Sequence, residues 1–132
     1  MTTVPLERSD TLNPIRVSLA VDSNVYLYSA EIEPDSLARS RCLSRSRSEH
    51  SASWTDLLLL EQGGPSINLD VNWVTIDSVS PGRVYRATVE ILDSAGELAP
   101  AKPGSRNPMT IHRHIGPASN PTDTASVRIT IG

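Results

Sequence analysis

Tyr85-Arg86-Ala87-Thr88-Val89-Glu90-Ile91 is the stretch of sequence that decides the fold most clearly. Apolar or aromatic side chains stand at every second position, and Arg, Thr and Glu fill the positions between them. Successive side chains of a β-strand point to opposite faces, so this alternation predicts a strand that buries one face and exposes the other.

The same period of two recurs along the rest of the chain. Alternating runs occupy residues 15–21, 25–32, 67–73 and 125–131, and a shorter run covers residues 109–115. Clusters of Asp, Asn, Ser, Pro and Gly separate these runs, as is typical of turns in all-β proteins. Roughly six to eight such strands predict an all-β fold, an antiparallel β-sandwich with long loops, in one domain that spans residues 1–132.

Two local features of these strands are predicted from their patterns. Asp22-Ser23-Asn24 is a short polar joint between two alternating runs, which is typical of a β-hairpin. In the second run, four residues are expected to share one face: Tyr26, Tyr28, Ala30 and Ile32. After Trp73 the apolar positions move to Val74 and Ile76, and this change of phase predicts a β-bulge.

The segment from residue 36 to residue 52 is rich in Arg and Ser and has no clear period. We expect a loop or a short helix there, and the run Trp54–Leu60 is compatible with either a helix or a buried strand. At most one short helix is therefore expected, within about residues 35–60. Residues 1–13 precede the first alternating run and are expected to form an N-terminal arm.

A local resemblance refines the expected fold. In the run Val79-Ser80-Pro81-Gly82-Arg83-Val84-Tyr85, an apolar residue and a Pro-Gly turn precede a Tyr and an alternating strand. With the turn that follows, residues 79–97 resemble the corner before the sixth strand of fibronectin type III domains. The resemblance implies an immunoglobulin-like sandwich with a structural corner formed by Val79, Pro81, Gly82 and Tyr85. It also implies that the Tyr ring enters the core and that its hydroxyl bonds to the backbone of the crossing connection.

Charge and composition exclude several classes of protein. The net charge of −3 argues against a protein built mainly to coat nucleic acid, and the longest apolar run, Leu57–Leu60, is far shorter than a membrane span. Cys42 is the only cysteine and forms no internal disulfide. The first ten residues lack the basic and apolar regions of a secretory signal. We therefore expect synthesis in the cytoplasm and leave the final location open, a virion included.

No familiar catalytic spacing occurs in the sequence. It holds no Gly-x-Ser-x-Gly element and no glycine-rich phosphate loop, so we expect neither an enzyme nor a cofactor. His112 and His114 lie two apart on a predicted strand and face the same way. With His50 or Asp123 as a third ligand they are weak candidates for a metal site. The interpretation we favour is two polar residues on the solvent face and no metal.

Four arginines form the densest positive cluster of the sequence: Arg39, Arg41, Arg45 and Arg47. One interpretation is a contact with phosphate or nucleic acid, and another is a contact with an acidic patch on a partner subunit. The third interpretation, which we favour, is an exposed Arg- and Ser-rich loop that balances an acidic protein.

These observations predict a structural or interaction module. Blocks of opposite charge suit contacts between copies, and a strand at the end of the chain suits pairing with a neighbour. We expect protein partners, through self-association or docking into a larger assembly such as a virion coat, decoration or tail, and no membrane. One alternative is a carbohydrate- or small-ligand-binding sandwich that uses Trp54, Trp73, Tyr26 or Tyr28. The other is a nucleic-acid contact through residues 39–47.

Overall fold

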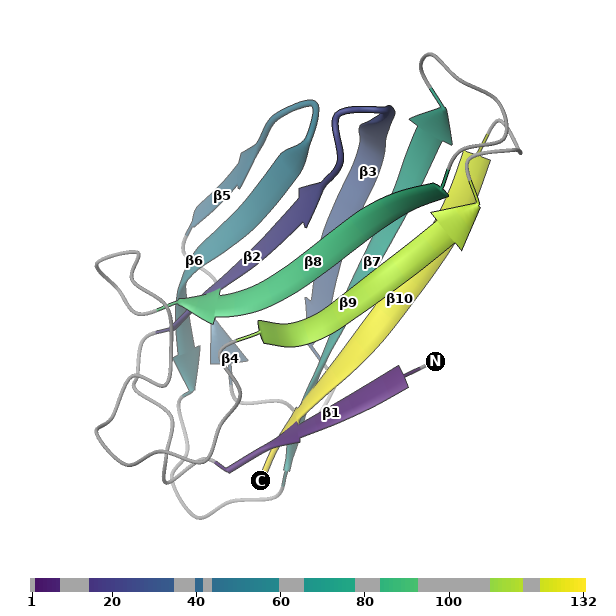
Figure 1. The fold of residues 1–132 in the computed structure, drawn as a ribbon. Coiled ribbons are helices and arrows are strands. Elements are labelled where there is room, and N and C mark those ends of the chain that lie inside the picture. Colours follow the sequence, from purple (N-terminus) through teal and green to yellow (C-terminus); the bar gives the residue numbers. More distant parts are fainter. Residues whose placement is uncertain are drawn as a thin grey trace.

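The computed structural model describes residues 2–7, 15–34, 40–41, 44–59, 66–77, 84–92, 110–117 and 122–132. The strands of these ranges form two sheets that face each other (Figure 1). The first, called sheet A, contains in spatial order β1 (Thr2–Leu6), β10 (Thr122–Ile131), β7 (Ile67–Asp77) and β3 (Val25–Pro34). The second, called sheet B, contains in spatial order β6 (Ser51–Leu59), β2 (Ile15–Val21), β8 (Val84–Leu92) and β9 (Thr110–Pro117), and β6 also pairs with β4 (Ser40–Arg41) and β5 (Ser44–Arg47). The predicted all-β sandwich is confirmed.

Neighbouring strands are antiparallel except at one edge of sheet A. There β1 runs parallel to β10, with Thr2 opposite Val127 and Leu6 opposite Ile131. The backbone N–H of Gly132 donates a hydrogen bond to the carbonyl of Leu6 at 3.1 Å. Residues 2–6 of the expected N-terminal arm are therefore an edge strand of the sandwich.

The core lies between the two sheets and follows the alternation of the sequence. β8 buries Tyr85, Ala87, Val89 and Ile91, and β10 buries Val127, Ile129 and Ile131. Trp54 of β6 and Trp73 of β7 are 2% and 1% exposed. Because burial of one large apolar side chain contributes about 1.5–3 kcal/mol, these residues hold the sheets together without a disulfide.

The possible helix within residues 35–60 is not present in the described part of that segment. Ser40–Arg41, Ser44–Arg47 and Ser51–Leu59 are β-strands. β5 and β6 form a hairpin, closed by a hydrogen bond of 2.7 Å from the N–H of Ser48 to the carbonyl of Ser51. The Ser- and Arg-rich run of β5 does not specify a strand by itself. It forms one because β6, which is held in the sheet by its pairing with β2, gives it a strand to pair with. No helix in the described ranges has the length and apolar character to cross a membrane.

The predicted hairpin between residues 15–21 and 25–32 is wrong. β2 lies inside sheet B between β6 and β8, whereas β3 lies in sheet A, so Asp22–Asn24 crosses from one sheet to the other. The carboxylate of Asp22 accepts a hydrogen bond from the backbone N–H of Arg86 at 3.0 Å. The side-chain amide of Asn24 donates to the carbonyl of Val84 at 3.1 Å. The same polar residues suit a hairpin or a corner, and the corner forms because β2 has a strand on both sides.

The predicted bulge near Val74 lies in the neighbouring strand instead. β7 keeps its alternation, because Trp73 and Thr75 are both buried. The irregularity occurs in β3 between Leu27, which lies opposite Thr75, and Ser29, which lies opposite Val74. Tyr28 is thus the extra residue of a bulge.

This bulge changes which residues of β3 share a face. The buried set changes phase at Tyr28 and consists of Val25, Leu27 and Ala30. Tyr26 and Tyr28 are 45% and 64% exposed, so the expectation that they share a face with Ala30 is wrong. The exposed tyrosines are the first element of the candidate site.

Candidate functional site

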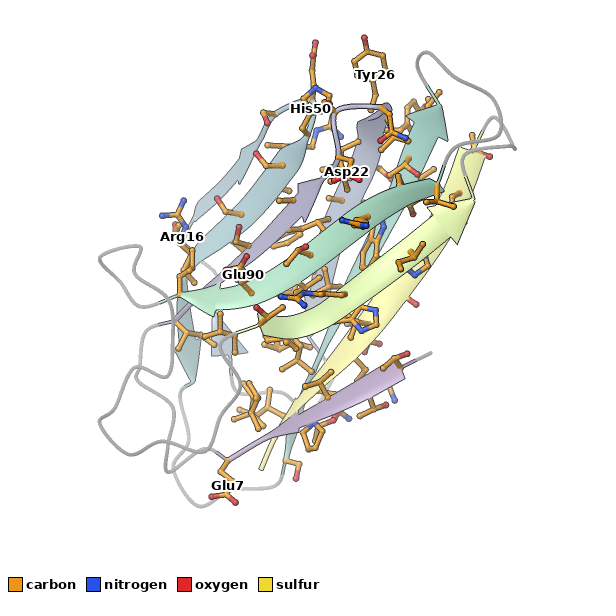
Figure 2. The ribbon with its side chains drawn as sticks, viewed as in Figure 1. Glu7, Arg16, Asp22, Tyr26, His50 and Glu90 are labelled. Atoms are coloured by element: carbon orange, nitrogen blue, oxygen red, sulfur yellow. The ribbon has the colours of Figure 1, made fainter. Side chains whose placement is uncertain are left out.

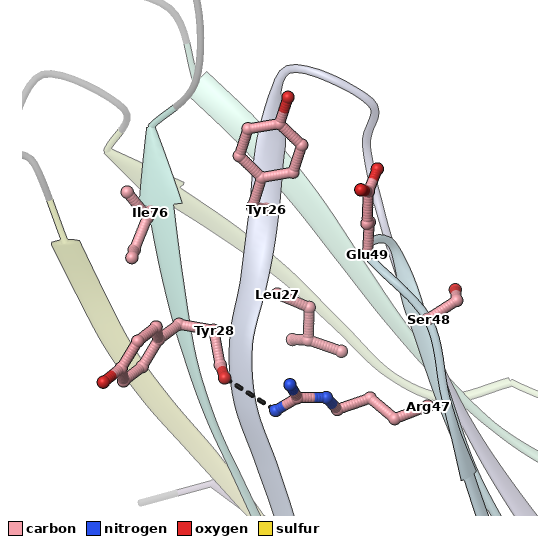
Figure 3. A pocket seen from close by; sticks show the side chains of 7 residues that line it. All are labelled: Tyr26, Leu27, Tyr28, Arg47, Ser48, Glu49 and Ile76. Carbon is pink, nitrogen blue, oxygen red and sulfur yellow. Dashed lines mark hydrogen bonds between the residues drawn. The ribbon is translucent and has the colours of Figure 1, made fainter.

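Two of the five aromatic residues lie on the surface, and both belong to β3. Tyr26 and Tyr28 are exposed, whereas the two Trp and Tyr85 are buried. A hollow of about 580 Å³ (Figure 3) is lined by Tyr26, Leu27, Tyr28, Arg47, Ser48, Glu49 and Ile76. We call these seven residues the Tyr26–Tyr28 surface.

The β5–β6 hairpin fixes this surface from one side. Nη1 of Arg47 donates a hydrogen bond to the carbonyl oxygen of Tyr28 at 2.6 Å. The backbone N–H of Leu27 donates to the carbonyl of Glu49 at 2.7 Å. The ring of Tyr28 points away from Arg47 (Figure 3). The bulge of β3 is therefore held by hydrogen bonds to its backbone while the ring stays free for contact.

Tyr26 is fixed by a second element of the same hairpin. Its ring stacks on the imidazole of His50, with 5.8 Å between ring centroids and 19° between planes. Nδ1 of His50 lies 3.0 Å from the carbonyl oxygen of Val25, so this nitrogen is the donor of the pair. Tyr26 and His50 lie together at one end of the sandwich (Figure 2). The Tyr26 ring and the backbone of Tyr28 are thus arranged before any contact is made.

The Arg cluster predicted from the sequence is only partly described. Arg39 lies outside the described residues, and Arg41 and Arg45 lie in β4 and β5, with side chains that also fall outside them. Arg47 is exposed and bonds to Tyr28. Arg41, Arg45 and Arg47 stand on strands, so the interpretation of an exposed loop is wrong for these three. A phosphate or acidic-partner contact stays a prediction.

A second polar group lies between the sheets where β8, β9 and β10 meet. The hydroxyl of Tyr85 donates a hydrogen bond to Oδ2 of Asp123. Nε2 of His114 lies 3.2 Å from the same oxygen. The His114 ring also contacts Trp73 and Tyr85, with centroids 5.7 Å away in each case. These contacts join β8 and β9 of sheet B to β7 and β10 of sheet A.

The Tyr85 hydroxyl acts as a hydrogen-bond donor within this group. Burial raises the pKa of Tyr85 to about 12, and the hydrogen bond to Asp123 acts in the same direction. The ring is buried, as the resemblance to the fibronectin type III corner implies. The hydroxyl partner differs from the implied one, because it is a carboxylate of β10 and not the backbone of a crossing connection. Val79, Pro81 and Gly82 of that corner lie outside the described residues.

His112 and His114 share a face, as predicted, but it is not the solvent face. In the β8–β9 pairing they lie opposite Val89 and Ala87, which are both buried. Burial lowers the pKa of His112, and the neighbouring charge of His114 acts in the same direction. Asp123 reaches His114, but within the described ranges no group of three or more His, Cys, Asp and Glu is arranged to hold a metal ion.

A second exposed apolar group lies on the outer side of β8 and β9. Val84 is 59% exposed and Ile115 is 66% exposed. A hollow of about 400 Å³ beside them is lined by Arg86, Thr88, Arg113, His114 and Ile115. We call Val84, Arg86, Arg113 and Ile115 the β8–β9 face.

Sequence reasoning missed the β8–β9 face. Ile111 and Ile115 are four residues apart, so an unbroken strand would place both on one side. A register shift between Val89 and Glu90 interrupts the pairing, and Ile111 is buried while Ile115 is exposed. No local signal marks such a shift.

No protein-family model, no curated protein and no solved structure matches the chain.

Proposed function

We propose that this protein is a non-enzymatic interaction module that docks on another protein through the Tyr26–Tyr28 surface. The observation that carries the proposal is the exposure of Tyr26 and Tyr28 in a chain whose other aromatic side chains are all buried. Tyr and Arg are enriched in protein interfaces, where they supply a large contact area and directed hydrogen bonds. Arg47 lines the same hollow as both tyrosines, so the surface contains Arg as well as Tyr.

The fixed geometry of the surface supports the same function. Arg47 and Glu49 hold the backbone of β3, and His50 stacks on Tyr26. Side chains that are ordered before binding lose less conformational entropy when a partner arrives. A surface of this kind gains affinity without rearrangement of the sandwich.

The most concrete form of the proposal is a subunit of a larger assembly, such as a virion coat, decoration or tail component with an immunoglobulin-like sandwich. Within the described strands, β3 and β9 end their sheets and each pair with a neighbour on one side only. Such edges suit contacts between subunits. The position of the Tyr85–Asp123 pair between the sheets, with the Tyr85 ring buried and Asp123 partly buried, supports a structural role for that pair and not a catalytic one.

Photo-crosslinking tests the docking function. A benzophenone amino acid in place of Tyr28 is compared with the same group in place of Thr3, an exposed residue of β1. In lysate of the source cells, we expect residue 28 to give one dominant protein adduct that Tyr26→Ser removes. Equal yields at residues 28 and 3, or no adduct at residue 28, would contradict the proposal.

A carbohydrate-binding function is the second candidate, and the same exposed rings favour it. Tyr rings stack on sugar rings, and Arg47, Ser48 and Glu49 offer hydrogen-bonding groups around the same hollow. Trp54 and Trp73 do not serve this purpose, because both are buried. A glycan array probed with the wild-type protein and with Tyr28→Ser decides between the two functions. Saturable sugar binding that Tyr28→Ser abolishes would favour the carbohydrate function, and an empty array would remove it.

A further inference from the structure

The four large apolar side chains that stand most exposed in the described residues fall into two groups. Tyr26 and Tyr28 belong to β3, which ends sheet A and lies against β2 and β6. Val84 and Ile115 belong to β8 and β9, and β9 ends sheet B and lies against β10. The strands β3 and β9 therefore lie at opposite edges of the sandwich (Figure 1), while the start of β8 adjoins the start of β3, where the Asn24 amide donates to the carbonyl of Val84.

The charges next to these two groups are opposite in sign. Glu31 and Glu33 continue β3 beyond Tyr28 and are exposed. Arg86 and Arg113 flank Ile115 on the other side and are exposed as well. Within the described part of the chain, none of these four side chains forms an ion pair.

The other charges near the two groups are mostly engaged. Asp70, opposite Glu33, is paired with Arg128 through contacts of 2.7 and 3.0 Å. Arg47 bonds to the Tyr28 carbonyl, and Asp22 accepts a hydrogen bond from the backbone of Arg86. The carboxylates of β3 and the guanidinium groups of β8 and β9 are thus among the charges available for a contact on each side.

We propose that the β8–β9 face of one molecule docks on the β3 side of a second copy of this chain. The proposal rests on the proposed function and names its partner. Arg86 and Arg113 line the hollow of about 400 Å³, which receives Glu31 or Glu33 of the second copy. A guanidinium group binds a carboxylate through two parallel hydrogen bonds, and Ile115 packs on the ring of Tyr28 of that copy.

The position of the two surfaces sets the symmetry of the assembly. They differ in composition and belong to the edges of different sheets, so each copy uses one surface for each neighbour. Such head-to-tail contacts generate a ring or a filament, and not a closed dimer with a two-fold axis.

Charge reversal with complementation tests this assembly. One variant carries Glu31→Arg and Glu33→Arg, and the other carries Arg86→Glu and Arg113→Glu. Light scattering after size-exclusion chromatography is expected to show oligomers for the wild type and a monomer for each variant alone. An equimolar mixture of the two variants is expected to regain the oligomers. The intact β8–β9 face of one variant docks on the intact β3 side of the other, and their two reversed surfaces are again opposite in charge. Thr3→Arg, which adds charge on β1, keeps the wild-type mass.

Several results would overturn the head-to-tail assembly. The wild type would be monomeric at every concentration, or would stop at the dimer. Alternatively, a charge-reversed variant would still assemble alone, or a mixture of the two folded variants would stay monomeric. Circular dichroism checks that each variant folds. If a charge-reversed variant is unfolded, the milder single substitutions Glu33→Gln and Arg113→Gln are used in its place. Each of these is expected to lower the average oligomer mass. If the wild type is monomeric while residue 28 crosslinks to a different protein, the assembly fails and the docking function stands.

Discussion

Tyr85 of β8 and Asp123 of β10 connect the two sheets across 38 residues of sequence, through a hydrogen bond from the Tyr hydroxyl to the carboxylate. His114 of β9 reaches the same carboxylate, so three strands share one partly buried polar contact. A carboxylate that accepts hydrogen bonds in a closed environment stabilises a fold only while its donors remain. The pair therefore holds the β9 side of the sandwich in place.

Tyr85→Phe removes the donor and leaves the ring. We expect the free energy of unfolding to fall by about 1–3 kcal/mol, because the Asp123 carboxylate loses a buried hydrogen bond. Urea unfolding followed by Trp fluorescence measures the change. Tyr26→Phe is the matched control at an exposed ring and is expected to stay within about 0.5 kcal/mol of the wild type. An equal effect of the two substitutions would argue against the role of the Tyr85–Asp123 pair.

Gly116→Ala is expected to be destabilising because of the same pair. A Cβ at residue 116 would lie 2.6 Å from Oδ2 of Asp123 and 2.7 Å from Cζ of Tyr85. Neither group moves easily, so we expect a loss of about 1–3 kcal/mol in urea unfolding. Gly132→Ala is the control, since its nearest neighbour is the side-chain hydroxyl of Ser66 at 3.0 Å. A Gly116→Ala protein as stable as the wild type would show that the Tyr85 ring does not lie where we place it.

Acidification is expected to destabilise the fold in part through His112. The pKa of His112 in the folded protein lies below its ordinary value of 6.5, first because of burial and second because of His114. The unfolded chain therefore takes up this proton more readily. The stability contributed by neutral His112 is present above the ordinary pKa and is lost as the pH falls through the lowered one. Between about pH 8 and about pH 5, the Tm should fall less in His112→Gln than in the wild type. An identical fall in both would remove His112 as a cause.

The Trp residues give a spectroscopic check of the core. Trp54 and Trp73 are both buried, so the folded protein should show blue-shifted emission that iodide quenches weakly. Unfolding in urea should shift the emission to the red and restore quenching. Strong quenching of the folded protein would place at least one Trp on the surface, and would reopen a role for Trp in sugar binding.

The strands with unbroken alternation were predictable from the sequence. Tyr85–Ile91 and Ala125–Ile131 alternate without a fault, and β8 and β10 bury the predicted side chains except Ala125, which is partly buried. Their pattern depends only on which face is apolar, and that is a local property.

The position of the candidate site was not predictable in the same way, because it depends on pairing. The bulge at Tyr28 forms where β3 must match β7, and the register shift in the β8–β9 pairing exposes Ile115. Asp22–Asn24 has the composition of a hairpin turn and becomes a corner, since β6 and β8 flank β2. Each of these events is decided by a strand distant in sequence, and no local pattern records it.

The molar mass of the purified protein, measured by light scattering at rising concentration, tests most directly that copies of this chain assemble through the exposed tyrosines. The wild type should exceed the monomer mass of 14.3 kDa in steps of that mass, and Tyr28→Ser should return it to 14.3 kDa. A wild type that stays at 14.3 kDa at every concentration, or a Tyr28→Ser protein that assembles like the wild type, would contradict self-assembly through the Tyr26–Tyr28 surface.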